Sequence, residues 1–364
     1  MDRFFWGLCH IAVCRIALSA IGMLPFLSPA KAGEHLSLDN GPGDEAVASF
    51  RQQCDLEICD RSGWFFGAEA TYLAPLYSSG DASFSLFDTT PSPPVGVTLG
   101  SDFGKADQLT GAPRVVFGYT GRRGLGWQFR YWELNNSLAR NDFPDAIVGN
   151  QAQLLGGSDA FEAYAIDLEL TQEFRTRRWD WLGSFGVRHA MFDQSRFTSV
   201  SGAVNDDIFS LSSWQGAAFH GTGLTFGLAG LKPIHPCRGL SFYLNKRVSA
   251  VFGSAKTRAI TNSQFSGTGG FAGSLNGAID ESDETLFILE TGAGVQWSRC
   301  VRGYNSRMFA RIGVEYQYWT NSGGSAIAES FSGTPDSSLG IASARGGSHD
   351  VHLVGLAAMA GFAW

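Results

Sequence analysis

The sequence predicts an all-β protein, a closed antiparallel transmembrane β-barrel of about ten strands over residues 63–364. Segments in which apolar residues alternate with small or polar ones recur along the chain, as in barrel strands. The links between them alternate strictly between short and long. No stretch after residue 32 reaches the roughly 18 apolar residues that mark a spanning helix. Twelve strands is the alternative, because ASFSLF and VGVTLG in the first long link could add a hairpin.

Ten segments carry the alternation. In the closing VHLVGLAAMAGFAW, Val354, Leu356 and Phe362 share one face with further apolar residues, whereas Gly355 and Gly361 belong to the opposite face, which is made mainly of small residues. About 9 to 11 tilted residues suffice for a barrel strand to cross a bilayer. The predicted strands are Trp64–Tyr77, Ala112–Tyr119, Gly124–Trp132, Ala160–Phe174, Trp179–Met191, Ala217–Leu231, Leu240–Gly253, Thr285–Ser298, Arg307–Trp319 and Val351–Trp364.

The sorting of the links favours a barrel over a soluble β-sandwich. The short links are TGRR, RTRR, KPIHPCR and RCVRGYN. Outer-membrane barrels have short periplasmic turns and longer extracellular loops, whereas a sandwich has no reason to sort its loops in this way. The long links, rich in Gly, Ser, Asn and Asp, are Ser78–Gly111, Glu133–Asp159, Phe192–Gly216, Ser254–Glu284 and Thr320–Asp350.

The beginning of the chain predicts export. Arg3 and Arg15 precede an apolar run, Ile16–Leu27, and SPAKA then offers an A-x-A cleavage site, so residues 1–32 are predicted to be a signal peptide. An uncleaved membrane helix is the alternative, although the run is short for one. Residues 33–62 then form a periplasmic segment before the barrel. The terminal aromatic Trp364 resembles the signal by which the barrel assembly machinery recognises its substrates, and the predicted location is the bacterial outer membrane.

Charge distribution points to lipid rather than nucleic acid. Lys and Arg number 27 against 34 Asp and Glu, a formal net charge of −7. The short links are basic and would favour an anionic leaflet. The long links are acidic and could bind divalent cations that bridge them to lipopolysaccharide, although simple solvation explains them as well. The basic residues of the short links are Arg122, Arg123, Arg175, Arg177, Arg178, Lys232, Arg238, Arg299 and Arg302.

Ten charged residues fall on the faces that we expect to line the lumen. Their signs balance, and buried charges are costly unless they are paired or hydrated, so they either pair across a plugged barrel or line a wet channel. About eight strands are filled by side chains and about sixteen leave a channel, so ten strands imply a narrow lumen. We expect Arg247 and Glu290, on adjacent strands, to form a clasp. The lumen-lining set is Glu69, Arg114, Arg130, Asp167, Glu169, Arg188, Arg247, Glu290, Arg311 and Glu315.

Four cysteines follow the predicted signal peptide, and all fall on the short-turn side, in the oxidising periplasm. Four cysteines allow three pairings. Cys237 and Cys300 lie in successive short turns, and Cys54 and Cys59 are close in sequence, so we predict the disulfides Cys54–Cys59 and Cys237–Cys300. Metal binding by these cysteines is the alternative.

Several segments resemble a known family. GWFFGAEATYLAP, GYTGRRGLGWQFRYWEL, and AIDLELTQEF followed by a basic turn are similar to the Legionella-type pore-forming outer membrane protein family of planctomycetes and other bacteria. The resemblance covers residues 63–364. It implies a pore-forming barrel and supplies no catalytic residue.

The predicted function is a pore that passes ions or small solutes through a narrow charged lumen, with no enzymatic activity, cofactor or metal. His189, His220 and His352 have no ligand partner at i+2 or i+4 on an inward face, so no metal site is expected. Two alternatives remain. One is a non-conducting surface anchor or adhesion barrel. The other is a barrel protease built on acid and histidine residues of the long links, although their spacing disagrees with such a site: Asp206, Asp207, His349 and Asp350.

Overall fold

A computed structural model describes most of the chain after residue 61. The described residues are 62–77, 82–88, 95–100, 109–140, 146–148, 151–176, 178–204, 207–235, 239–267, 270–301, 306–320, 325–334, 338–347 and 350–364. The predicted signal peptide, the segment 33–61 and three of the four cysteines that follow the signal peptide lie outside them. No helix among these residues is both long and apolar enough to cross a membrane.

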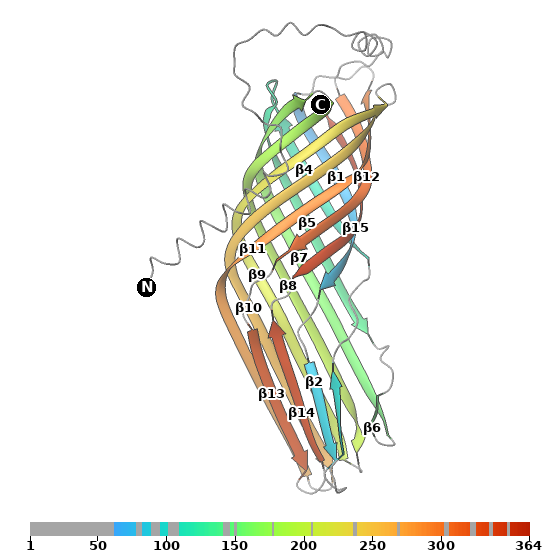
Figure 1. Ribbon diagram of the computed structural model, residues 1–364, viewed down its shortest axis with the longest axis vertical. Helices are drawn as coiled ribbons and strands as arrows, with labels where there is room; N and C mark the ends of the chain where they lie inside the picture. Colours follow the sequence, from blue (N-terminus) through green and yellow to red (C-terminus); the bar gives the residue numbers. More distant parts are fainter. Residues whose placement is uncertain are drawn as a thin grey trace, which may run out of the picture. The chain divides into compact units, whose positions relative to one another are not determined.

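Ten antiparallel strands form a closed barrel (Figure 1). The sheet runs β5-β4-β1-β15-β12-β11-β10-β9-β8-β7, and pairing of β5 with β7 closes it, from Leu125 opposite Gln172 to Arg140 opposite Gly157. Closure satisfies the backbone groups of every strand. The barrel strands are β1 (Gly63–Tyr77), β4 (Thr110–Thr120), β5 (Leu125–Arg140), β7 (Gln151–Thr176), β8 (Trp179–Val204), β9 (Asp207–His235), β10 (Leu240–Gly267), β11 (Gly270–Val301), β12 (Ser306–Trp319) and β15 (Val351–Ala363).

The ten predicted strands are confirmed, and the twelve-strand alternative is wrong for the barrel. ASFSLF and VGVTLG do form a hairpin, β2 (Ala82–Asp88) and β3 (Val95–Gly100). This hairpin instead joins a separate four-stranded sheet with β13 (Ser325–Thr334) and β14 (Ser338–Gly347), in the order β13-β14-β2-β3. The physical reason is that β2 finds its second partner in β14, from the last long link, rather than in a barrel strand.

Parts of the long links continue the barrel strands. Strands β8 and β9 stay paired as far as Val204 opposite Asp207, and β10 and β11 as far as Gly267 opposite Gly270. These stretches are polar because they extend beyond the lipid, where the outward face of a strand meets water. Composition alone therefore suggested loops. A short strand, β6 (Ala146–Val148), also pairs with the start of β7.

The four-stranded sheet packs closely on the extensions of β10 and β11. Ala259 of β10 forms a buried cluster with Ala326, Ala328 and Ala344 of the smaller sheet. A Cβ added at Gly346 would lie 2.5 Å from the carbonyl oxygen of Arg258, so only glycine fits there. At the edge of the sheet, side chains bridge the two layers: Asn276 Nδ2 donates to the carbonyl oxygen of Glu329 (2.8 Å), and the Phe331 N–H donates to Ser274 Oγ (3.0 Å).

The outer surface of the barrel carries an apolar band between two aromatic girdles. At the short-turn end, Trp64 packs on Phe117 (ring centroids 5.3 Å apart) and Trp127 (5.8 Å). At the other end, the girdle consists of Tyr131, Tyr164, His189, Tyr316, Tyr318 and His352. The exposed side chains between the girdles are apolar and include Phe66, Leu168, Leu170, Val187, Leu224, Phe226, Ile312, Val314, Val354 and Leu356. This is the surface of a transmembrane barrel, and the chain is an outer-membrane β-barrel.

Replacing Gly346 by Val should detach the smaller sheet while leaving the barrel intact, because the new Cβ would collide with backbone that cannot move aside. We expect limited proteolysis to cleave the variant on both sides of β13 and β14, whereas the barrel still shifts its mobility on heating in gels. Ser343→Val, on the less buried side of the same strand, is the matched control and should resist the protease. Equal resistance of both variants would contradict the close packing.

Cys300 is disulfide-bonded, and its partner lies outside the described residues. The pairing with Cys237 stays a prediction. It is supported by the bond from the Ser298 N–H to the carbonyl oxygen of Gly239 (2.9 Å), because each of these residues is two positions from one of the two cysteines in the sequence. Peptide mapping without reductant should recover Cys237 linked to Cys300. Recovery of Cys300 linked to Cys54 or Cys59 would overturn it.

Candidate functional site: two layers across the barrel

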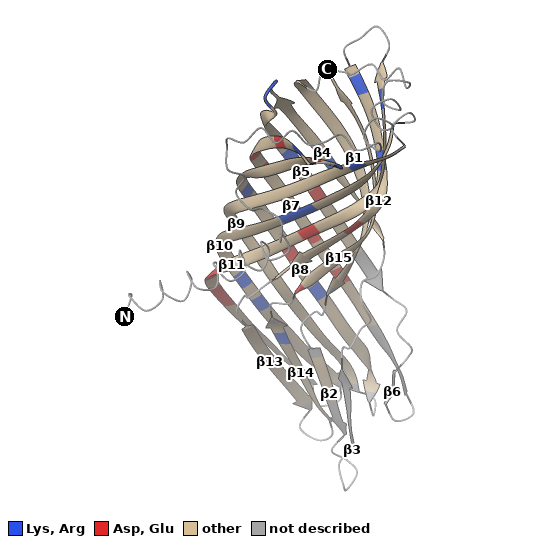
Figure 2. Cartoon of the chain, turned by 45° about the horizontal axis from the view of Figure 1, so that its top comes forward, with Lys and Arg blue, Asp and Glu red and all other residues tan. Residues whose placement is uncertain are grey.

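Charged side chains from several barrel strands meet in the interior of the barrel, and Figure 2 marks the positions of charged residues along the strands. All ten predicted lumen residues lie on inward positions. Successive side chains of a strand point to opposite faces, so inward positions recur at every second residue. Their places are Glu69 on β1, Arg114 on β4, Arg130 on β5, Asp167 and Glu169 on β7, Arg188 on β8, Arg247 on β10, Glu290 on β11, and Arg311 and Glu315 on β12.

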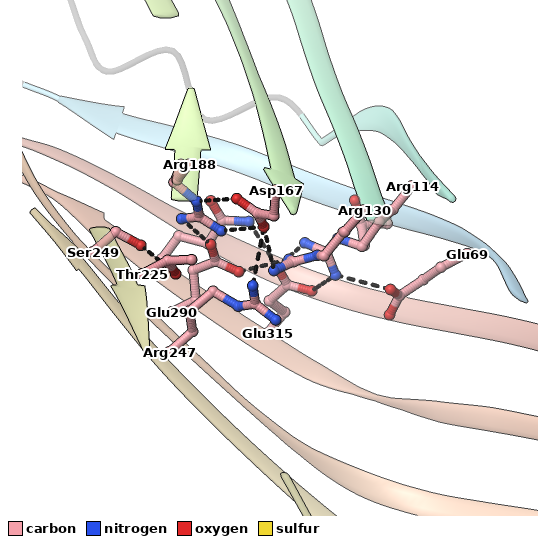
Figure 3. Close-up of polar contacts among 12 residues, drawn as sticks. Glu69, Arg114, Arg130, Asp167, Arg188, Thr225, Arg247, Ser249, Glu290 and Glu315 are labelled. Carbon is pink, nitrogen blue, oxygen red and sulfur yellow. Dashed lines mark hydrogen bonds and ion pairs between the residues drawn. The ribbon is translucent and has the colours of Figure 1, made fainter. Parts of the chain in front are cut away.

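The first group of ion pairs is centred on Asp167 and Glu290 (Figure 3). Arg188 holds both carboxylates, with its Nε 2.6 Å from Asp167 Oδ1 and its Nη1 2.5 Å from Glu290 Oε1. Arg130 also reaches both, at 2.6 Å from Glu290 and 3.6 Å from Asp167. Arg247 contacts Asp167 at 3.0 Å and pairs with Glu169. Three guanidinium groups are thus shared among three carboxylates.

A second group is built around Arg114. Its guanidinium donates to Glu69 (2.9 Å) and, through two nitrogens, to both oxygens of Glu315 (2.8 and 2.5 Å). Glu315 also accepts from Gln317 Nε2 (2.7 Å), and Gln317 in turn accepts from Trp319 Nε1 (3.0 Å). This chain of hydrogen bonds links the charged layer to the side chains that lie beyond it on β12.

Arg247 and Glu290, which were predicted to pair with each other, instead pair with other residues. The two residues are opposite each other in the β10–β11 register. However, Arg247 bonds to Asp167 and Glu169, whereas Glu290 bonds to Arg130 and Arg188. Pairs between adjacent strands do occur, as in Asp167 with Arg188, but for Arg247 and Glu290 the long arginine side chains reach partners on strands further round the barrel.

An apolar layer was missed by the sequence analysis. It fills the barrel between the charged layer and the end at which β8 to β11 extend beyond the other barrel strands. Each of the ten barrel strands contributes to it, and its largest members include Trp132 and Trp319, with ring centroids 5.8 Å apart. The sequence carried a signal for it, because inward positions in the second half of β1 and in β5 change from small or polar to large and apolar. The layer comprises Leu73, Ala112, Trp132, Leu134, Phe161, Ala163, Ala165, Ala190, Phe192, Ala217, Phe219, Val251, Ala255, Leu286, Ile288, Trp319, Val351 and Leu353.

Together the two layers close the barrel in this structure. The side chains of Asp167 and Arg188 are each 1% exposed, and the most exposed arginine of the ion pairs, Arg247, reaches only 13%. Nine of the ten charges are paired with the opposite sign, and this pairing is what keeps charges buried this deeply in their ionised forms. The interior is therefore a compensated salt layer stacked on an apolar layer.

The residues considered for a protease or a metal site do not come together in the described part of the chain. Asp206 and His349 lie outside it, and Asp350 accepts a hydrogen bond from the Tyr318 hydroxyl (2.5 Å). His189 and His352 belong to the outer girdle, bonded to tyrosine hydroxyls. Within the described residues, no group of three or more His, Cys, Asp or Glu side chains is arranged to hold a metal ion.

Comparison with solved structures returns bacterial outer-membrane proteins. They include the protease OmpT of Escherichia coli (9% identity, 82% of this chain, 97% of that chain, TM-score 0.35) and OprG of Pseudomonas aeruginosa (9%, 83%, 99%, 0.23). The toluene transporter TodX of Pseudomonas putida is a third (9%, 82%, 89%, 0.22). No family model and no curated protein matches the sequence. The functional argument therefore rests on the interior of the barrel.

Replacing Arg188 by Met should destabilise the barrel by about 3–5 kcal/mol, because Asp167 and Glu290 would each lose a buried partner. The measurement is urea unfolding in phospholipid vesicles. Lys232→Met, which removes an exposed charge near the short-turn end, is the control and should change stability little. An Arg188→Met barrel as stable as the control would show that the ion pairs are not what holds the charged layer.

Proposed function

We propose that this protein is an outer-membrane pore that passes ions or small solutes through its narrow charged lumen and is closed at rest by the charged and apolar layers. The observation that carries the proposal is the charged layer itself. Apolar side chains of similar volume would fill a ten-stranded barrel with equal or better stability, because buried ion pairs seldom repay their desolvation. Ten charges at this depth therefore point to a role for them in the lumen beyond filling it.

Polar and small side chains lie on both sides of the closed layers. Beyond the apolar layer, the buried inward side chains include the polar residues Asn136, Gln194, Thr198, Ser213 and Gln215, followed further out by the apolar residues Val200, Phe209 and Leu211. Toward the short-turn end, inward positions include small residues such as Gly186, Gly227 and Gly292 beside the larger Tyr243. Opening then requires rearrangement of the two middle layers and a path past these larger side chains.

Conduction should increase when either layer is thinned. We expect single-channel recordings of the native protein to show rare, small steps. Trp132→Ala with Trp319→Ala, which empties the apolar layer, and Arg247→Ala with Glu290→Ala, which thins the charged layer, should each raise the open probability. Trp297→Ala removes the same ring from the lipid-facing surface and should leave the steps unchanged. All recordings are made on barrels that still shift their mobility on heating.

A second candidate is a non-conducting barrel that anchors and displays the structure outside the membrane. It is favoured by the depth of burial of both layers and by the length of β8 to β11, which run to 26, 29, 28 and 32 residues and support the smaller sheet. Silence of the native protein and of both double variants, with barrels still folded, would refute the pore and leave this candidate.

A further inference from the structure

Arg311 differs from the other nine charged residues of the lumen. The other nine form ion pairs with one another, whereas Arg311 has no carboxylate within 4.0 Å among the described residues. It lies on β12 four residues before Glu315, and β12 begins at the short-turn end, so Arg311 stands on the periplasmic side of the charged layer. Its positive charge therefore faces the periplasmic half of the lumen.

Two uncharged groups fix the position of Arg311, and the carboxylate of Glu69 attracts it from beyond ion-pair distance. Its guanidinium lies over the Tyr243 ring, 4.5 Å from the centroid. Gln296, directly opposite in the β11–β12 register, accepts hydrogen bonds from Arg311 Nε (3.2 Å) and Nη2 (2.9 Å) through one oxygen. A cation–π contact and an amide acceptor fix the orientation of the side chain, and neither carries a formal charge.

We propose that Arg311, with Gln296 and Tyr243, forms an anion-binding site that sets the charge selectivity of the lumen; this rests on the proposed pore. The site contains three groups that can donate hydrogen bonds to a ligand: Arg311 Nη1, Gln296 Nε2 and the Tyr243 hydroxyl. A small inorganic anion fits this set, because it accepts from several donors at once, compensates the guanidinium and is small enough to enter a narrow lumen.

The net charge of the lumen side chains depends on Arg311. The nine paired residues comprise five carboxylates and four guanidinium groups, and Arg311 supplies the fifth positive charge. Removing it leaves one net negative charge inside a low-dielectric wall, where a single charge is screened little. The lumen should then attract cations instead of anions.

Reversal potentials in a KCl gradient test the selectivity. The native protein should prefer chloride, Arg311→Gln should invert the preference, and Arg311→Lys, which keeps the charge, should retain it. Arg123→Gln makes the same charge change on an exposed turn and is the matched control. An unchanged reversal potential in Arg311→Gln, in a barrel that conducts, overturns the inference while leaving the pore in place.

Anion binding can also be measured without conduction, so that failure of the pore and failure of the site are distinguishable. Replacing the gluconate in the buffer by chloride, at constant ionic strength, should raise the temperature at which the native barrel unfolds. The reason is that a ligand that binds only the folded state stabilises it. The rise should be lost in Arg311→Gln and kept in Arg123→Gln. An equal response of the native protein and Arg311→Gln overturns the site, whether or not the barrel conducts.

Discussion

Backbone hydrogen bonding in lipid is the constraint on which the rest of this structure depends. A strand in the hydrocarbon region has no water to satisfy its N–H and C=O groups, so the sheet must close, and it does so through β5 and β7. Closure with ten strands leaves a narrow interior in which long side chains can meet across the lumen. The reach of Arg130, Arg188 and Arg247 across the lumen follows from that width.

Much of this architecture could be predicted from the alternation of apolar with small or polar residues in the sequence. Lipid demands apolar side chains outward, so the outward faces of β1 and β15 could be assigned residue by residue, and the inward charges followed from the same periodicity. The pairing of charges across the lumen could not be predicted, because it depends on how far each arginine reaches in three dimensions. Glu290, for example, faces Arg247 in register but is held by Arg130 and Arg188.

The regions outside the membrane were harder to predict, because strands in water do not need apolar side chains on their outward face. A strand with one face in water and the other on a thin alanine-rich core, as around Ala259 and Ala344, has the composition of a loop. Pairing of β2 with β14 joins segments more than 200 residues apart, and no pattern in the sequence of either segment predicts it. The apolar layer was missed because large apolar side chains were expected to face lipid, although the same periodicity places Trp132 and Trp319 on the inward faces that carry Arg130 and Glu315.

The two layers close the barrel by opposite physical means, and this difference decides how it could open. Ion pairs weaken when water enters, because hydration replaces the partner that each charge would lose. An apolar layer resists water, and wetting it costs free energy in proportion to the area exposed. The Trp319–Gln317–Glu315–Arg114 chain of hydrogen bonds joins the two layers, so a shift of the tryptophan is felt at the ion pairs. In the proposed pore, opening is therefore a coupled event in which the apolar layer is wetted and the ion pairs become hydrated together.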